Sequence, residues 1–420
     1  MSVTRLAVIG QGYVGLPVAM RAVDAGFSVT GVDLDDCRVA ALAAGESYVE
    51  DVSRTRLAGA LATGRYHPTA SYAEAAGFDA AIITVPTPLT GSRPDLTFIE
   101  AAGRQLAPRL RPGAVVVLES TTYPGTTEEL LVPLLEAGSG LVAGRDFAVG
   151  YSPERIDPGN PEWTFENTPK IVSGIDAGSL VAVRALYDRL VERTVPVAGT
   201  RVAELAKLLE NTFRHVNIAL VNELAMFAGE LGVDVWAAIN AASTKPFGFQ
   251  RFLPGPGVGG HCLPIDPTYL SWHVRDRLGR GFRFVELANE VNDHMPEYVV
   301  RRLVHALNQR HIAVPDSRIL ALGIAYKGNT GDVRSSPAHR VVELLIGLDA
   351  VVDVVDAHVD PRRCPAGVKT VELTEDAVRL ADAVVLLTDH DDVDYALVER
   401  TAGFVLDTRH RLAGGQVEFL

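Results

Sequence analysis

Cysteine is scarce in this 420-residue chain, which has only Cys37, Cys262 and Cys364. An odd number of thiols so far apart provides no disulfide framework. There is no CxxC and no paired Cys/His spacing, so the pattern of a zinc site is missing and we predict no metal.

Basic residues are also few. The chain has 39 Lys and Arg against 52 Asp and Glu, which gives a formal net charge of −13. A broad nucleic-acid surface needs a basic excess, so we expect no nucleic-acid partner. A few local basic groups or backbone N–H groups still suffice for an anionic ligand. No apolar run approaches the ~18 residues of a membrane span, and the first expected strand leaves no room for a signal peptide. We therefore expect a cytoplasmic protein without a membrane partner.

Strand-like and helix-like segments alternate along the first half of the chain. Continuous apolar runs predict strands at residues 5–10, 27–33, 80–86, 114–121 and 147–155, with helices at 16–25, 97–109 and 126–135. Such alternation is typical of a parallel sheet covered on both faces. Further strands are expected within 317–328, 350–360, 382–389 and 403–410, which indicates a second, smaller α/β unit.

The middle of the chain is helical. Residues 202–231 keep i, i+3, i+4 apolar spacing with no Gly or Pro before Gly229, far beyond the ~11-residue average helix. A helix this long bridges domains or forms a dimer interface, and another helix is expected near 284–309. We predict an α/β protein with two Rossmann-like, doubly wound parallel-sheet domains joined by this helix. The expected domains are 1–198, 199–313 and 314–420.

A dinucleotide site is indicated by "VIGQGYVGLPVA", in which Gly10, Gly12 and Gly15 follow a strand and open a helix. The first glycine makes the tight turn, the second admits a pyrophosphate, and the third packs helix on strand. Asp33 ends the second strand. There its carboxylate can accept hydrogen bonds from the hydroxyl groups of an adenosine ribose and would repel a 2′-phosphate. The pattern predicts NAD rather than NADP. Arg38 either neutralises a cofactor phosphate or is a solvated helix charge.

Cys262 stands in the loop "PGPGVGGHCLP", among glycines that allow a ligand to approach and prolines that fix the path of the loop. In an NAD-binding chain such a thiol suggests addition to an aldehyde, followed by hydride loss to a thioester. His261 or loop N–H groups could lower the pKa of the thiol. The alternative is a half-buried, inert cysteine.

Lys207 and Asn211 are four residues apart on the long predicted helix, so their side chains share a face. Together they could stabilise an oxyanion, although Lys207 could equally be a surface residue. Glu204 and Glu210 are expected to be solvated.

Seven stretches in the same order make the chain resemble the UDP-glucose/GDP-mannose dehydrogenase family over essentially its whole length. They are "GQGYVGLP", "VPTPL", "ESTTYPGTT", "GYSPERIDPGN", "ELAKLLENTFRHVNIALVNELA", "GPGVGGHCLPIDPTYL" and "LGIAYKGNTGDVRSSPA". The resemblance implies an N-terminal NAD-binding Rossmann domain, a central helical dimerisation region and a C-terminal sugar-nucleotide-binding domain. It also implies oxidation of the C6 alcohol of a nucleoside-diphosphate hexose to a carboxylate, with two NAD reduced, by a homodimer.

The resemblance assigns roles by position. Cys262 would form the thiohemiacetal and thioester, Lys207 and Asn211 would stabilise the oxyanion, and Asp266 and Glu154 would act on water that Thr121 holds. Cofactor contacts are implied for Gly10, Gly12, Tyr13, Val14, Gly15, Asp33, Arg38, Pro86, Thr87, Thr121 and Arg334. Substrate contacts are implied for Glu154, Arg155, Lys207, Asn211, Phe249, Arg251, Gly259 and Lys327.

The identity of the substrate sugar has two possible interpretations. "SPER" and "GGHCLP" resemble the branch that acts on UDP-N-acetylhexosamines such as UDP-GlcNAc, whereas UDP-glucose or dTDP-glucose is the alternative. Gly328 and Gly331 stand where the family commonly has Pro and Asp, a departure in the sugar-nucleotide domain. Two other classes remain: a single-step hydroxyacid-type dehydrogenase that needs no Cys262, and a non-catalytic NAD sensor.

Overall fold

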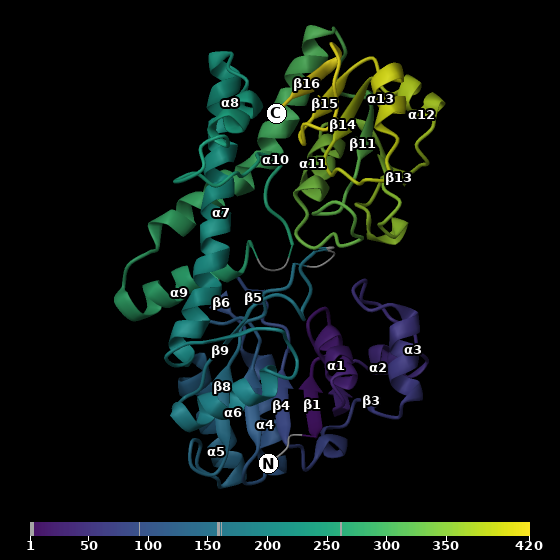
Figure 1. The fold of residues 1–420 in the computed structure, drawn as a ribbon. Coiled ribbons are helices and arrows are strands. Elements are labelled where there is room, and N and C mark those ends of the chain that lie inside the picture. The colour runs from purple at the N-terminus through teal and green to yellow at the C-terminus, as the bar shows by residue number, and fades with distance from the viewer. Residues whose placement is uncertain (1–3, 92, 158–159, 161, 261–262) are drawn as a thin grey trace. The chain divides into compact units, whose positions relative to one another are not determined.

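The computed structural model describes the chain except residues 1–3, 92, 158–159, 161 and 261–262. The chain forms two compact units, Met1–Glu210 and Asn211–Leu420 (Figure 1). Each contains one six-stranded, all-parallel sheet. No helix within the described ranges is long and apolar enough to cross a membrane.

The sheet of the first unit has the strand order β3-β2-β1-β4-β7-β8. Its strands are β1 (Arg5–Ile9), β2 (Ser28–Val32), β3 (Tyr66–Thr69), β4 (Ala80–Ile83), β7 (Val115–Leu118) and β8 (Ala148–Tyr151). Its helices are α1 (Gly15–Asp24), α2 (Asp36–Ala43), α3 (Arg54–Ala62), α4 (Thr97–Leu106), α5 (Val132–Ser139) and α6 (Ala177–Tyr187). The first unit also contains two separate two-stranded sheets. One is β5 (Leu89–Thr90) with β6 (Arg93–Pro94), and the other is β9 (Lys170–Val172) with β10 (Thr194–Pro196). This strand order is that of a doubly wound dinucleotide-binding fold.

Alternate residues of each strand of the first sheet enter two different cores. In β1, Leu6 and Val8 pack with α1, α3 and α6, whereas Ala7 and Ile9 pack with α4 and α5. Because both faces are covered, the central strands are continuous apolar runs. The strands predicted at β1, β2, β4, β7 and β8 are confirmed, whereas β3 was not predicted.

The second unit repeats the same strand order in the sheet β13-β12-β11-β14-β15-β16. The strands are β11 (Arg318–Leu322), β12 (Val351–Val355), β13 (Lys369–Thr370), β14 (Ala383–Leu386), β15 (Val405–Asp407) and β16 (Val417–Phe419). Helices α11 (Pro337–Ile346), α12 (Glu375–Leu380) and α13 (Tyr395–Thr401) lie between them in the chain. The predicted fold class, with two Rossmann-like sheets and a long central helix, is confirmed.

The helical segment comprises α7 (Thr200–Leu231), α8 (Val235–Ala242), α9 (Asp266–Leu278) and α10 (Arg283–Gln309). Helix α7 continues through 32 residues, as the apolar periodicity predicts. Asp234 then caps α8 by accepting from the backbone N–H groups of Trp236 and Ala237. Pro296 lies inside α10 without ending that helix.

Candidate active site

The predicted NAD loop joins β1 to α1, and its three glycines meet different surroundings. A Cβ at Gly10 would lie 2.8 Å from the Thr84 carbonyl oxygen, and one at Gly15 only 1.8 Å from the Gly10 carbonyl oxygen. At Gly12 a Cβ would have no described atom within 4 Å. Gly10 and Gly15 are therefore needed by the fold, whereas Gly12 leaves open space beside the backbone. That space fits the pyrophosphate of a dinucleotide.

Asp33 directly follows β2 and is 8% exposed. Its Oδ2 accepts from the Gln11 backbone N–H at 2.8 Å, and its Oδ1 accepts from the Asp35 N–H at 3.0 Å. A carboxylate offers about four acceptor positions, so Asp33 retains capacity for a ribose hydroxyl. Arg38 lies 3.6 Å from Asp33 and 3.5 Å from Asp35, and its guanidinium lies over the Tyr48 ring at 5.7 Å from the ring centroid.

Gln11 and Tyr48 hold this loop, and the sequence analysis did not identify them. The Tyr48 hydroxyl donates to the Gln11 carbonyl oxygen at 2.6 Å, and Tyr66 donates to Gln11 Oε1 at 2.8 Å. Burial raises the pKa of Tyr66 above its ordinary value, so this phenol remains a donor. The only sequence signal is a polar residue between two motif glycines.

The other predicted residues of the first unit follow the carboxyl ends of neighbouring strands. Pro86 and Thr87 come after β4, Thr121 after β7 and Glu154 after β8. Because these strands are parallel, the residues that follow them lie at the same carboxyl-terminal end of the sheet as Gly10 and Asp33. Pro86 is exposed and Thr87 buried, while Thr121 is half-buried beside a fully buried Thr122. Tyr13 is 36% exposed and Val14 is half-buried.

Glu154 is held on both carboxylate oxygens. Its Oε1 accepts from the backbone N–H groups of Arg155 and Ile156, each at 2.6 Å. Its Oε2 accepts from Lys170 Nζ at 2.9 Å. Arg155 forms a two-pronged ion pair with Glu210, at 2.7 and 3.2 Å.

The long helix carries Lys207 in the first unit and Asn211 in the second, and Lys207 is 8% exposed, hence mostly buried. The expectation that Glu204 is solvated was wrong. Glu204 is fully buried and accepts from the backbone N–H groups of Gly125 at 2.6 Å and Thr127 at 2.9 Å. Glu210 is partly exposed and paired with Arg155, so it is not simply solvated either.

In the second unit, Asn211 Nδ2 donates to Asp266 Oδ2 at 2.5 Å, and Asp266 begins α9 with 2% of its surface exposed. Two predicted catalytic side chains are therefore in direct contact. Cys262 and His261, which carry the proposed nucleophile and its activation, lie outside the described residues.

The glycines before Cys262 serve packing within the second unit. A Cβ at Gly259 would lie 2.7 Å from both the Ser335 carbonyl oxygen and Tyr326 Cβ, and one at Gly260 would lie 2.8 Å from the Tyr326 ring. The Gly255 N–H is fixed by Asn222 Oδ1 at 2.9 Å. At Gly259 and Gly260 the backbone is therefore closely approached by the 326–337 segment.

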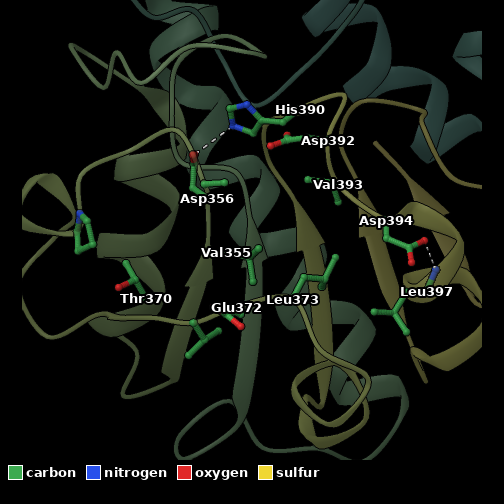
Figure 2. Close-up of a pocket in the computed structure, with 13 residues that line it drawn as sticks. Val355, Asp356, Thr370, Glu372, Leu373, His390, Asp392, Val393, Asp394 and Leu397 are labelled. Carbon is green, nitrogen blue, oxygen red and sulfur yellow. Dashed lines mark hydrogen bonds and ion pairs between the residues drawn. The ribbon is translucent and has the colours of Figure 1, made fainter. Parts of the chain in front are cut away.

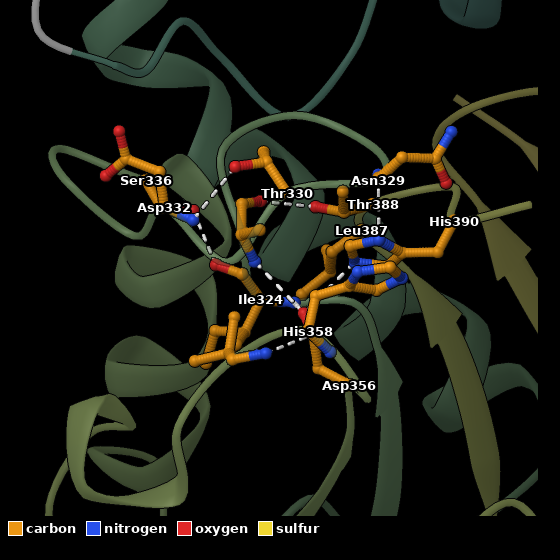
Figure 3. A network of polar contacts seen from close by, with 12 residues as sticks. Ile324, Asn329, Thr330, Asp332, Ser336, Asp356, His358, Leu387, Thr388 and His390 are labelled. Atoms are coloured by element: carbon orange, nitrogen blue, oxygen red, sulfur yellow. Dashed lines mark hydrogen bonds and ion pairs between the residues drawn. The ribbon is translucent and has the colours of Figure 1, made fainter. Parts of the chain in front are cut away.

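Lys327, half-buried, lies in the loop after β11, which a polar network fixes (Figure 3). Asp356 Oδ2 accepts from the Ile324 N–H at 2.8 Å and from His390 Nε2 at 3.1 Å. Although burial raises the pKa of Asp356, His390 and backbone donors outweigh it and hold that pKa at about 2. His390 Nδ1 accepts from the Asn329 N–H at 3.0 Å, so both ring nitrogens are engaged.

Three remaining predicted residues lie at exposed positions in the second unit. Arg334 pairs with Asp332 at 2.6 Å, Arg251 donates to Asn240 Oδ1 at 2.9 Å, and Phe249 is 41% exposed. The Gly328 departure has a local reason, because a Cβ there would lie 2.5 Å from the Asp389 carbonyl oxygen.

A cavity of about 580 Å³ opens at the carboxyl ends of β12 and β14 (Figure 2). Its described lining includes Asp356, Glu372, Asp392 and Asp394 and no Lys or Arg. Such a lining repels a diphosphate. His358, His390 and Asp392 bring candidate metal-ligating atoms within 4.8 Å of one another there, but both His390 nitrogens are already hydrogen-bonded.

Comparison with known proteins gives three consecutive matches. Residues 4–191, 201–294 and 320–413 match the NAD binding, central and UDP binding domains of the UDP-glucose/GDP-mannose dehydrogenase family. A UDP-N-acetyl-D-mannosamine dehydrogenase of Pyrococcus horikoshii is 36% identical over 92% of this chain and 90% of its own length. A UDP-N-acetyl-D-glucosamine 6-dehydrogenase of Pseudomonas aeruginosa is 38% identical over 84% of this chain and 82% of its own. The structure of a UDP-glucose dehydrogenase from Pyrobaculum islandicum is similar with a TM-score of 0.87 and 28% identity, over 100% of this chain and 97% of that one.

Proposed function

Because the chain belongs to the UDP-glucose/GDP-mannose dehydrogenase family, we propose that this NAD-dependent enzyme oxidises the C6 alcohol of a nucleoside-diphosphate hexose to a uronic acid in two steps. The observation that carries the proposal is the series of three matched domains, in order, on a chain with two Rossmann-like sheets. The matched ranges also support the division into domains at 1–198, 199–313 and 314–420. NAD, when bound, accepts a hydride in each oxidation, and the Gly10–Gly15 loop and Asp33 would hold it.

The chain's own groups account for the remaining chemistry. The Cys262 thiolate adds to the aldehyde carbon, so that the half-oxidised sugar is neither hydrated nor lost before the second oxidation. Lys207 and Asn211 stabilise the oxyanion of the thiohemiacetal. After the second hydride leaves, water attacks the thioester carbon, a carboxylate takes the water proton, and the carbon–sulfur bond breaks to regenerate the thiolate. Thr121, Asp266 and Glu154 are the residues proposed to hold and activate that water.

The proposed sugar is a UDP-N-acetylhexosamine, such as UDP-GlcNAc. "SPER" and "GGHCLP" support it, as do the names of the relatives from P. horikoshii and P. aeruginosa. UDP-glucose or dTDP-glucose is the alternative, since the similar structure from P. islandicum is that of a UDP-glucose dehydrogenase. We expect the enzyme to act in the cytoplasm.

The test is NADH formation with UDP-GlcNAc, UDP-ManNAc, UDP-GalNAc, UDP-glucose, dTDP-glucose and GDP-mannose. We expect two NADH per sugar and the highest turnover with an N-acetylhexosamine. Cys262→Ser should abolish the second oxidation. One NADH per sugar, with turnover preserved in Cys262→Ser, would instead establish a single-step dehydrogenase.

A homodimer is proposed from the surface of α7 within the second unit. Phe213, Leu220, Leu224, Phe227 and Leu231 are spaced by seven, four, three and four residues and are 47–77% exposed. This is the spacing of an apolar helix seam. Large apolar side chains in such a row are covered when a second helix packs on them.

A further inference from the structure

Lys170 is a buried ammonium group that the proposed mechanism does not use. It begins β9 and is 2% exposed. Its Nζ lies 2.9 Å from Glu154 Oε2 and 3.3 Å from Glu119 Oε1. A charge is rarely buried so deeply unless it is paired, and this one has two carboxylate partners.

Glu119, on the other side of the ammonium, follows β7 and is 1% exposed. The Tyr187 hydroxyl of α6 donates to the same Oε1 that Lys170 contacts. The other carboxylate oxygen, Glu119 Oε2, has no hydrogen-bond partner within the described part of the chain. Burial raises the pKa of Glu119 to about 7. The positive charge of Lys170 lowers this pKa in part, and the negative charge of Glu154 raises it. Burial lowers the pKa of Lys170, but the two carboxylates outweigh it, so the ammonium remains charged.

The contacts of Glu154 determine which oxygen can meet water. Oε1 is occupied by the backbone N–H groups of Arg155 and Ile156. Oε2 has Lys170 as its described partner, so the ammonium acts on the oxygen that is left for chemistry. Charge-assisted contacts of this kind fix a carboxylate in one orientation.

We propose that Lys170 is a positioning residue for Glu154 in hydrolysis of the thioester, and that Glu119 controls how strongly Lys170 holds Glu154. The inference rests on the proposed two-step oxidation. In that step the water oxygen bonds to the thioester carbon, its proton passes to Glu154 Oε2, and the cysteine sulfur leaves as thiolate, with no change in oxidation state. While Glu154 carries the proton, Glu119 is the carboxylate that remains beside the ammonium.

The test compares wild type, Lys170→Met and Glu119→Gln on the best nucleotide sugar of the panel. We expect Lys170→Met to release its first two NADH per site at the wild-type rate and then slow at least ~100-fold, the usual contribution of general base catalysis. Intact-mass spectrometry should show the enzyme carrying the uronyl group. Because only the step after acylation slows, KM should fall together with kcat and kcat/KM should stay at the wild-type value. Lys369→Met, at an exposed position of β13, is the matched control and should behave as wild type.

Glu119→Gln supplies a readout that a structural role would not move. We expect it to turn over but to lose the inflection near pH 7 in the steady-state rate. The Lys170→Met/Glu119→Gln double variant removes one charge of each sign, so it should fold even if Lys170→Met does not, and it should stall with the same adduct.

Two results would overturn the inference about Lys170 and leave the proposed function intact. One is normal steady-state turnover of Lys170→Met, and the other is equal slowing of both NADH-forming steps without an accumulated adduct. If wild type itself forms only one NADH per sugar, the proposed function fails, and this inference with it.

Discussion

Gly12 differs from the other two glycines of its motif in what a side chain would meet. Because the space there is open, Gly12→Ala should leave the melting temperature unchanged while its methyl group occupies the place of a pyrophosphate. We expect the Kd for NAD, measured by calorimetry, to rise ~10-fold or more, which corresponds to ~1.4 kcal/mol.

Gly15→Ala is the matched comparison, since its Cβ would lie 1.8 Å from the Gly10 carbonyl oxygen and should disrupt folding. If Gly12→Ala bound NAD as tightly as wild type, the loop would not hold the cofactor.

Single residues were predictable where the local pattern defines their neighbours. Gly10, Gly15 and Asp33 are recognisable because strand, turn and helix are contiguous in sequence. Glu204 was not, because the N–H groups that bind it come from Gly125 and Thr127, which are 79 and 77 residues away.

At the scale of elements, Glu204 joins α7 to the helical turn Thr127–Leu131 that precedes α5. Burial raises the pKa of Glu204 to about 7, although the Gly125 and Thr127 donors lower it. A raised pKa of the folded state means that stability is greatest below the ordinary value of 4.5 and falls as pH rises through about 7.

Glu204→Gln should therefore flatten the decline in unfolding free energy between about pH 4.5 and 7. The wild-type minus variant difference should change by up to ~1.4 kcal/mol per pH unit in denaturant titrations. Glu230→Gln, exposed on the same helix, should leave the slope as in wild type. Parallel curves for wild type and Glu204→Gln would contradict the assignment.

Elements with a strong apolar pattern were predictable and those without one were not. The apolar runs of β1 and β7 and the periodicity of α7 are strong signals, whereas the three residues of β9 begin with a lysine and carry almost no pattern. Lys170 was missed for that reason. A charged residue at the edge of the apolar run "KIVSG" is the one trace of it in the sequence.

At the scale of the whole molecule, one fold occurs twice with different chemistry. Asp33 and Asp356 both follow the second strand of their sheet, and each accepts an N–H from the loop after the first strand at 2.8 Å. Asp356 also accepts hydrogen bonds from Ala325, His358, Val359 and His390, and these fill acceptor positions that the described contacts of Asp33 leave open. The two parallel sheets were thus predictable from alternation, but the difference between them lies in contacts that the sequence does not display.

The exposed row on α7 makes a prediction for the assembly. Leu224, 47% exposed, lies in the middle of that row, so Leu224→Glu would place a carboxylate in the proposed interface. Burying an unpaired charge is strongly unfavourable, and we expect light scattering to show a dimer for wild type and a monomer for the variant. Leu380→Glu on α12, at a position 61% exposed, is the control and should remain dimeric. A monomeric wild type, or a Leu224→Glu variant that stays dimeric, would assign the row to a role other than dimerisation.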